Sequence, residues 1–132
     1  MSKASKKERE EFVAVLVREC PQVDAVQVAQ VAGRIMRHAA TYCRLAEESC
    51  NGHPAQGSPT MPAAQLGKLQ EKWDARIERE EARIEKLLTA AASELGLVAD
   101  FGGDPRGYTV KLMLPSGRSN SFGGEGYGVP TS

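Results

Sequence analysis

The residues whose types and spacing could do chemistry lie near the end of the chain, where arginine and tyrosine side chains alternate with glycines. Nine of the thirteen glycines stand at position 96 or later. Glycine loses more backbone entropy on folding than any other residue, so this density indicates sharp turns or a backbone that approaches a ligand closely. Between the glycines stand Arg106, Arg118, Asn120 and Tyr127. That mixture suits a small anionic ligand with an aromatic part.

The segment Asp104–Gly107 has the composition of a braced turn. Pro105 fixes one backbone dihedral angle, and Gly107 permits a positive one. Asp104 can accept backbone N–H bonds across the turn. The planar guanidinium of Arg106 would then be held on a rigid bend, in a form that fits a phosphate bidentately. The alternative is a tight hairpin in which Arg106 pairs with Asp100 or Asp104.

The remaining candidates follow this turn. Arg118 and Asn120 are two residues apart on an expected strand, so they share one face of it. Without the strand register, that face either borders the Asp104 turn or opposes it, and an exposed edge strand is the alternative. Tyr127, flanked by glycines, either stacks on a base or packs between the sheet and the helices.

Catalytic, metal and cofactor motifs are not evident, and we expect a binding protein rather than an enzyme. The glycine-rich end lacks the pattern of a phosphate-binding loop and precedes no helix. Cys43 and Cys50 are about 10.5 Å apart along an expected helix, too far for a disulfide. Cys50 and His53 have a spacing suited to zinc, but the chain has only two histidines. We therefore expect free thiols, including Cys20, in a reducing compartment.

The composition indicates a single domain over residues 1–132, with a formal net charge of zero. Zero net charge argues against general nucleic-acid binding. No apolar run approaches the ~18 residues of a membrane span, and no secretory signal is visible. We expect no membrane association and no cofactor.

Residues 1–95 are expected to be helical. A capping box at Ser5–Glu8 starts the first helix, which ends at Cys20 before a proline. The second runs from Asp24 to Cys50, and the third from Ala63 to Leu95. Their apolar seams comprise Val28, Val31, Ile35, His38, Tyr42 and Leu45 in the second helix, and Leu66, Leu69, Trp73, Ile77, Ile84, Leu87, Leu88, Ala91 and Leu95 in the third. His38 is expected to be a satisfied core histidine.

The third helix raises a packing problem. Its charged run Glu78–Glu81 is expected to be a solvated face with salt bridges. A helix of this length, about 45–50 Å, is too long for one small domain to cover. Either it bends or a second copy covers part of it, so we expect an antiparallel pair of long helices and a homo-oligomer.

Residues 96–132 are expected to form the β part. Gly96 is a candidate helix C-cap, after which the hydrophobic period changes. Strands are expected at Leu97–Phe101, Tyr108–Leu114 and Arg118–Phe122. The fold class is therefore α+β, with N-terminal helices and a small C-terminal antiparallel sheet.

Several motifs together resemble small proteins of bacteriophages. They are the runs Tyr42–Gly52, Gly103–Leu112, Pro115–Arg118 and Gly128–Pro130, with a long charged helix between the first two. Among such proteins the chain is most similar to the first-described Thoeris anti-defence family. Members of that family sequester cyclic ADP-ribose isomers produced by bacterial immunity, without cleaving them, and bind them at a subunit interface.

The resemblance implies a counter-defence protein acting in the cytoplasm of a bacterial host. It implies that Arg106 and Arg118 face a diphosphate, with Asn120 or Tyr127 near the ribose or base. Two other functions stay open. The chain could inhibit a host defence protein by direct contact, as anti-CRISPR proteins do, or be a small structural or DNA-associated phage protein.

Overall fold

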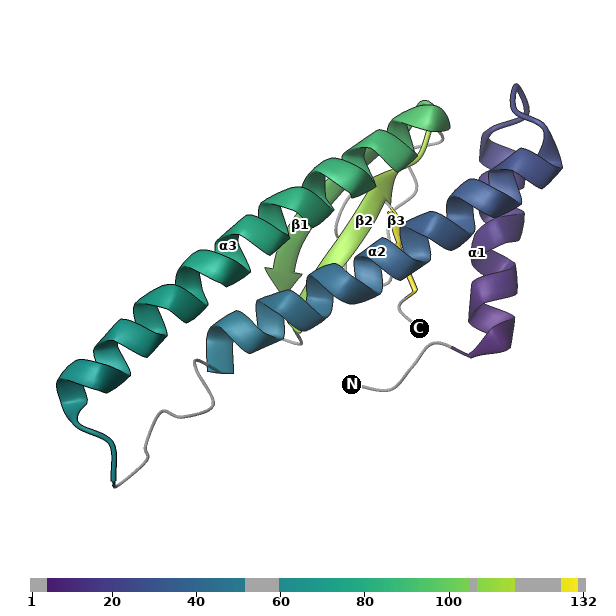
Figure 1. The fold of residues 1–132 in the computed structure, drawn as a ribbon. Helices are drawn as coiled ribbons and strands as arrows, with labels where there is room; N and C mark the ends of the chain where they lie inside the picture. The colour runs from purple at the N-terminus through teal and green to yellow at the C-terminus, as the bar shows by residue number, and fades with distance from the viewer. Residues whose placement is uncertain (1–4, 52–59, 105–106, 116–126, 131–132) are drawn as a thin grey trace.

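Three helices precede a small antiparallel sheet, which confirms the expected α+β class (Figure 1). The computed structural model describes residues 5–51, 60–104, 107–115 and 127–130. The elements are α1 (Lys6–Glu19), α2 (Ala25–Asn51), α3 (Ala63–Glu94), β1 (Val98–Asp104), β2 (Gly107–Met113) and β3 (Tyr127–Gly128). Among the described residues, no helix combines the length and the apolar character needed to cross a membrane.

Local side-chain chemistry sets the starts of the first two helices. The Ser5 hydroxyl accepts the Glu8 backbone N–H at 3.1 Å, as the capping box predicts. A carboxylate oxygen of Asp24 accepts the Val26 N–H at 3.1 Å at the start of α2. Between them, the chain turns at Cys20 and Pro21, since proline cannot continue a helix.

The end of α3 is a glycine cap. Gly96 has φ of +72°, a left-handed conformation that only glycine adopts without strain. The Leu97 N–H donates to the Ala92 carbonyl at 2.9 Å, and the Gly96 N–H donates to the Ser93 carbonyl at 2.9 Å. These bonds satisfy carbonyls that the helix end would otherwise leave open, and they turn the chain into β1.

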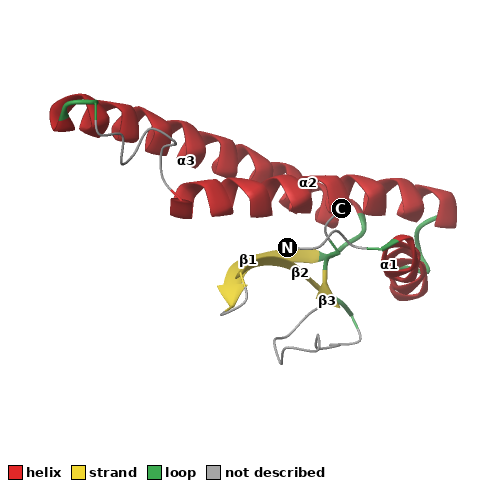
Figure 2. Cartoon of the chain, turned by 90° about the horizontal axis from the view of Figure 1, so that it is seen from below, coloured by secondary structure: helices red, strands yellow, loops and turns green. Residues whose placement is uncertain are grey.

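The molecule has two layers. The antiparallel helices α2 and α3 form one layer, and the sheet lies against one face of it (Figure 2). The short helix α1 lies steeply across the beginning of α2 (Figure 1). The fully buried large side chains come from all of these elements: Phe12, Leu16, Val28, Val31, Ile35, Leu45, Ile77, Leu88, Leu95, Val110 and Leu112. One core therefore joins α1, the helix pair and the sheet.

The sheet has the order β1-β2-β3, so β1 is an edge strand. In the β1–β2 hairpin, Val98 pairs with Met113 and Asp104 with Gly107. The third strand is at Tyr127–Gly128, where Tyr127 pairs with Leu112. The strand expected at residues 118–122 lies outside the described residues.

The predicted seam of α2 is confirmed at five of its six positions, which are all buried: Val28, Val31, Ile35, Tyr42 and Leu45. His38 is the exception, because it is half-exposed. In α3, Leu87 was wrongly placed in the seam and is 40% exposed, since it lies on the side of the helix beyond the buried row. Leu66, Leu69 and Trp73 are only half-buried, because the first turns of α3 extend beyond the end of α2 (Figure 1).

Candidate functional site: an arginine-lined groove between α2 and α3

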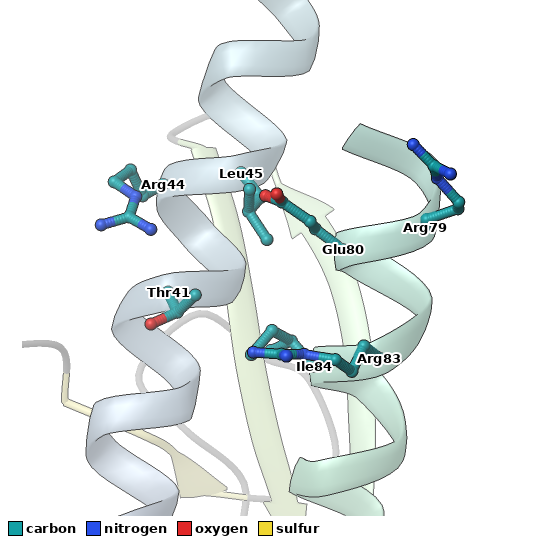
Figure 3. A pocket seen from close by; sticks show the side chains of 7 residues that line it. All are labelled: Thr41, Arg44, Leu45, Arg79, Glu80, Arg83 and Ile84. Carbon is teal, nitrogen blue, oxygen red and sulfur yellow. The ribbon is translucent and has the colours of Figure 1, made fainter. Parts of the chain in front are cut away.

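A groove of about 390 Å³ runs between the two long helices. Figure 3 shows it with the strands behind the helices, so it opens on the face of the helix pair that the sheet does not cover. Its lining residues are Thr41, Arg44 and Leu45 from α2, and Arg79, Glu80, Arg83 and Ile84 from α3. We call it the α2/α3 groove.

Helical spacing explains why these residues meet. Steps of three or four residues place side chains on one face of a helix. Leu45 and Ile84 are 2% and 5% exposed, and they anchor the two helices to each other at the base of the groove. The polar neighbours Arg44 and Arg83 are fixed beside these apolar residues and remain exposed.

The side chains of the groove point in different directions (Figure 3). Arg83 reaches from α3 into the space between the helices, and so does Glu80. Arg44 and Arg79 stand on the outer sides of their helices. The Thr41 hydroxyl donates to the Arg37 backbone carbonyl at 3.2 Å, which leaves its oxygen only as an acceptor. Arg83 is thus the cation placed centrally, with two arginines at the rim.

The electrostatic balance of the groove is positive. Three arginines line it against one carboxylate, that of Glu80. Glu80 lies 3.9 Å from Arg76, an exposed pair that attracts only weakly. Among the described residues, neither Arg44 nor Arg83 has an acidic partner within salt-bridge distance. Both cations are therefore available to an anion.

His38 lies on α2 about one helical turn before Thr41, and nearby arginine charges affect its pKa. Burial is the main reason that the pKa of its imidazole lies below the usual value. The charges of Arg37, Arg34 and Arg83 lower this pKa further. The expectation of a core histidine was wrong, because the His38 side chain is half-exposed. It is neutral at neutral pH.

Nearer the start of α2, an ion pair joins the two long helices. The Arg34 guanidinium binds the Glu94 carboxylate through two contacts, at 2.9 and 3.0 Å. This fork-to-fork geometry ties α2 to the last turn of α3. It also leaves Arg34 engaged, in contrast to Arg83.

The sequence-predicted site is described only in part. The register pairs Asp104 with Gly107, so the hairpin expected around the turn is confirmed for the backbone. Arg106, Arg118 and Asn120 lie outside the described residues. The backbone of Tyr127 is in β3, and the side chains of Asp104 and Tyr127 are not described. Their ligand-binding roles stay predictions.

Sequence reasoning missed the groove arginines. Arg79 falls within the charged run Glu78–Glu81, which was expected to be a solvated face, and Arg83 was not singled out. The available signal was the recurrence of basic residues every three or four positions along α3, which places them on one side of the helix. What the pattern could not give is the partner helix that makes this side one wall of a groove.

Thiol and metal chemistry have little support in the described part of the chain. All three cysteines are free, as predicted, with Cys20 and Cys43 buried and Cys50 exposed. Burial, and secondarily the charge of Glu47, raises the pKa of Cys43 to about 11. No group of three or more metal-ligating side chains occurs among the described residues. His53, the possible partner of Cys50 in a zinc site, is not among them.

Comparison with known proteins adds no assignment, since no family model, curated protein or solved structure matches this chain. The functional conclusion therefore depends on the residues themselves.

Proposed function

We propose that this chain is a binding protein that sequesters a phosphate-bearing cyclic nucleotide and does not cleave it. The ligand class is a cyclic ADP-ribose isomer, and the setting is a phage counter-defence in the cytoplasm of a bacterial host. The observation that carries the ligand chemistry is the positive α2/α3 groove, with Arg83 between the helices and Arg44 at the rim.

Arginine is suited to this task because its planar fork binds phosphate oxygens bidentately and stays charged at every physiological pH. Sequestration requires tight binding of a diphosphate and no general base or metal. Leu45 and Ile84 form the apolar base of the groove between the two helices.

The glycine-rich end supplies a second set of contacts in this proposal. Arg106 and Arg118, with Asn120 and Tyr127, are the residues that the family resemblance assigns to the diphosphate and the nucleoside. The same resemblance implies a homo-oligomer with ligand at a subunit interface. The groove and the tail are therefore tested separately.

Isothermal titration calorimetry with cyclic ADP-ribose isomers tests the proposal. Arg83→Gln should weaken binding by about 10- to 150-fold, the equivalent of about 1.5–3 kcal/mol for one charge-assisted hydrogen bond. Arg9→Gln on exposed α1 is the matched control and should bind as the parent protein does. Ligand recovered after denaturation of the complex should be intact.

The outcomes separate the parts of the proposal. Absence of binding for every isomer overturns the function. Binding that is lost in Arg106→Ala but unchanged in Arg83→Gln moves the site from the groove to the tail. Recovery of a linear product instead of the cyclic ligand contradicts sequestration and indicates an enzyme.

The alternative function, inhibition of a host protein by contact, is favoured by one observation. β1 is an edge strand, and its first residue Val98 is 64% exposed. An open edge offers unpaired backbone groups to another strand. A Val98→Pro variant should then lose inhibition of its target while nucleotide binding is retained.

A further inference from the structure

Most of the charges of α3 fall into two rows on different sides of the helix, and Glu80 is an acidic residue beside the basic row. The acidic row steps by three and four residues, and so does the basic row. The acidic row is Glu71, Asp74, Glu78, Glu81 and Glu85, and the basic row is Lys68, Lys72, Arg76, Arg79, Arg83 and Lys86. Arg79 and Arg83 line the α2/α3 groove, whereas Glu85 lines a hollow beside Phe101 of β1, together with Lys86 of the basic row. The rows therefore diverge at Arg79 and Arg83 and both reach the hollow beside Phe101.

This sorting is unfavourable for a helix on its own. Neighbours three or four residues apart stabilise a helix when their charges are opposite and destabilise it when they are alike. Within each row the neighbours are alike. The consequence is visible at Glu81, whose pKa is raised by burial and then by the charges of Glu85 and Glu78. In the described part of α3, Arg76 and Glu80 form the one ion pair within the helix, at 3.9 Å.

A strip of small residues separates the two rows on the back of α3. Ala75, Ala82 and Thr89 recur every seven residues, and all three are exposed. Small side chains allow another helix to approach to the short end of the usual 8–10 Å axial separation. Long charged side chains on either side of the strip could then reach across to a neighbouring helix.

Charge complementarity selects both the partner and its direction. A second α3 related by a two-fold axis parallel to the helix presents its basic row to the acidic row of the first, and the reverse. A two-fold axis perpendicular to the helix instead brings acidic row against acidic row. The first arrangement relieves the repulsion within both rows at once, whereas the second increases it.

We propose that the back of α3 is a self-association surface, on which the α3 of a second copy packs in parallel with the acidic row of each against the basic row of the other. Ala75, Ala82 and Thr89 form the contact strip. The proposal specifies the homo-oligomer named in the proposed function, but it does not depend on ligand identity. Arg83 is the member of the basic row that reaches into the α2/α3 groove (Figure 3).

Two charge-reversal variants test the surface. Glu78→Lys/Glu85→Lys lowers the acidic row from five negative charges to a net of one, and Arg79→Glu/Lys86→Glu lowers the basic row from six positive charges to a net of two. By light scattering at micromolar concentration the parent protein should be a dimer of 14.2 kDa chains, each variant a monomer, and an equimolar mixture of the two variants a dimer again. High salt should weaken the parent dimer, because exposed ion pairs are screened.

Matched controls exclude trivial explanations. Glu10→Lys/Glu11→Lys reverses two exposed acidic residues on α1 and should leave the dimer intact. Circular dichroism should show the same helix content in all variants. Calorimetry on Glu78→Lys/Glu85→Lys distinguishes failure of this proposal from failure of the proposed function. A monomeric variant that still binds the nucleotide supports the association surface and leaves the proposed ligand binding unchanged.

Cysteine cross-linking tests the direction in a Cys50→Ser background. In a parallel pair, Ala75→Cys forms a disulfide with itself, because equal positions lie opposite each other. In an antiparallel pair centred at Ala82, Ala75→Cys links to Thr89→Cys instead. A monomeric parent protein, a charge-reversed variant that stays dimeric, or exclusive Ala75→Cys to Thr89→Cys linkage overturns the proposal.

Discussion

The two ends of α3 contrast sharply although one apolar row runs through both. From Ile77 onward, the row is buried against α2 and the sheet at Ile77, Ile84, Leu88, Ala91 and Ala92. Before Ile77, the corresponding residues Leu66, Leu69 and Trp73 are half-buried, because the helix has passed the end of α2 (Figure 1). The difference teaches that periodicity identifies the face of a helix that can be buried, whereas a partner decides how much of it is.

The largest expected effect on stability comes from shortening an apolar side chain in the covered part of α3, compared with the same change in its projecting part. Leu88 is 0% exposed, so Leu88→Ala should lower the free energy of unfolding by about 2–5 kcal/mol through lost burial and a cavity. Leu69→Ala, in the projecting part, should cost about 1 kcal/mol or less. Urea denaturation of both variants measures the contrast. Equal losses would mean that the projecting part is covered after all.

A smaller effect on stability is expected from alanine substitutions at Gly67 and Gly96, which lie near the two ends of α3. Gly96→Ala should destabilise by about 1–2 kcal/mol, because φ of +72° strains any residue with a Cβ. The added methyl itself meets only the Gln22 amide nitrogen at 3.9 Å, so the cause is the backbone. Gly67→Ala, where nothing lies within 4 Å, should stabilise by about 0.5–1 kcal/mol. Thermal melting curves should shift in opposite directions, and shifts of the same sign would refute the cap.

The smallest expected effect is on the pH dependence of stability and concerns His38 of α2. The pKa of His38 is lowered in the folded state, so the unfolded chain binds a proton more readily. Stability that His38 contributes is present above its ordinary pKa of about 6.5 and is lost as the pH falls through the lowered value. His38→Gln should therefore flatten the decline in urea midpoint between neutral and mildly acidic pH. An unchanged slope would show that neither burial nor the neighbouring arginines shift the titration of His38 on folding.

Comparing the parent protein with His38→Gln also separates the titration of His38 from that of Glu81. Glu81 has a raised pKa, so its protonation in acid relieves repulsion and favours the folded state. This effect is opposite in sign to that of His38. In His38→Gln the contribution of Glu81 acts without the opposing one of His38, so the urea midpoint of this variant should fall less steeply in acid than that of the parent protein.

Much of the fold could be predicted from local sequence, for identifiable reasons. The capping box at Ser5, the Asp24 start and the Gly96 stop depend on bonds within a few residues, and all three are present. The β1–β2 hairpin likewise follows from alternation and a turn. Leu87 and His38 were misplaced because a seam drawn from spacing alone is wider than the face that a real partner covers.

The candidate site was predicted less well, because grooves are made by two elements. The sequence alone determined the long charged helix, the small residues that recur in it every seven positions, and the alternation that makes a sheet. Each of these depends on the geometry of near neighbours along one element. Only the tertiary structure decided that Arg83 and Arg44 stand at one groove with Leu45 and Ile84 beneath them. Their closeness depends on the antiparallel packing of α2 on α3, which brings together residues about forty positions apart, and no local interaction encodes that distance.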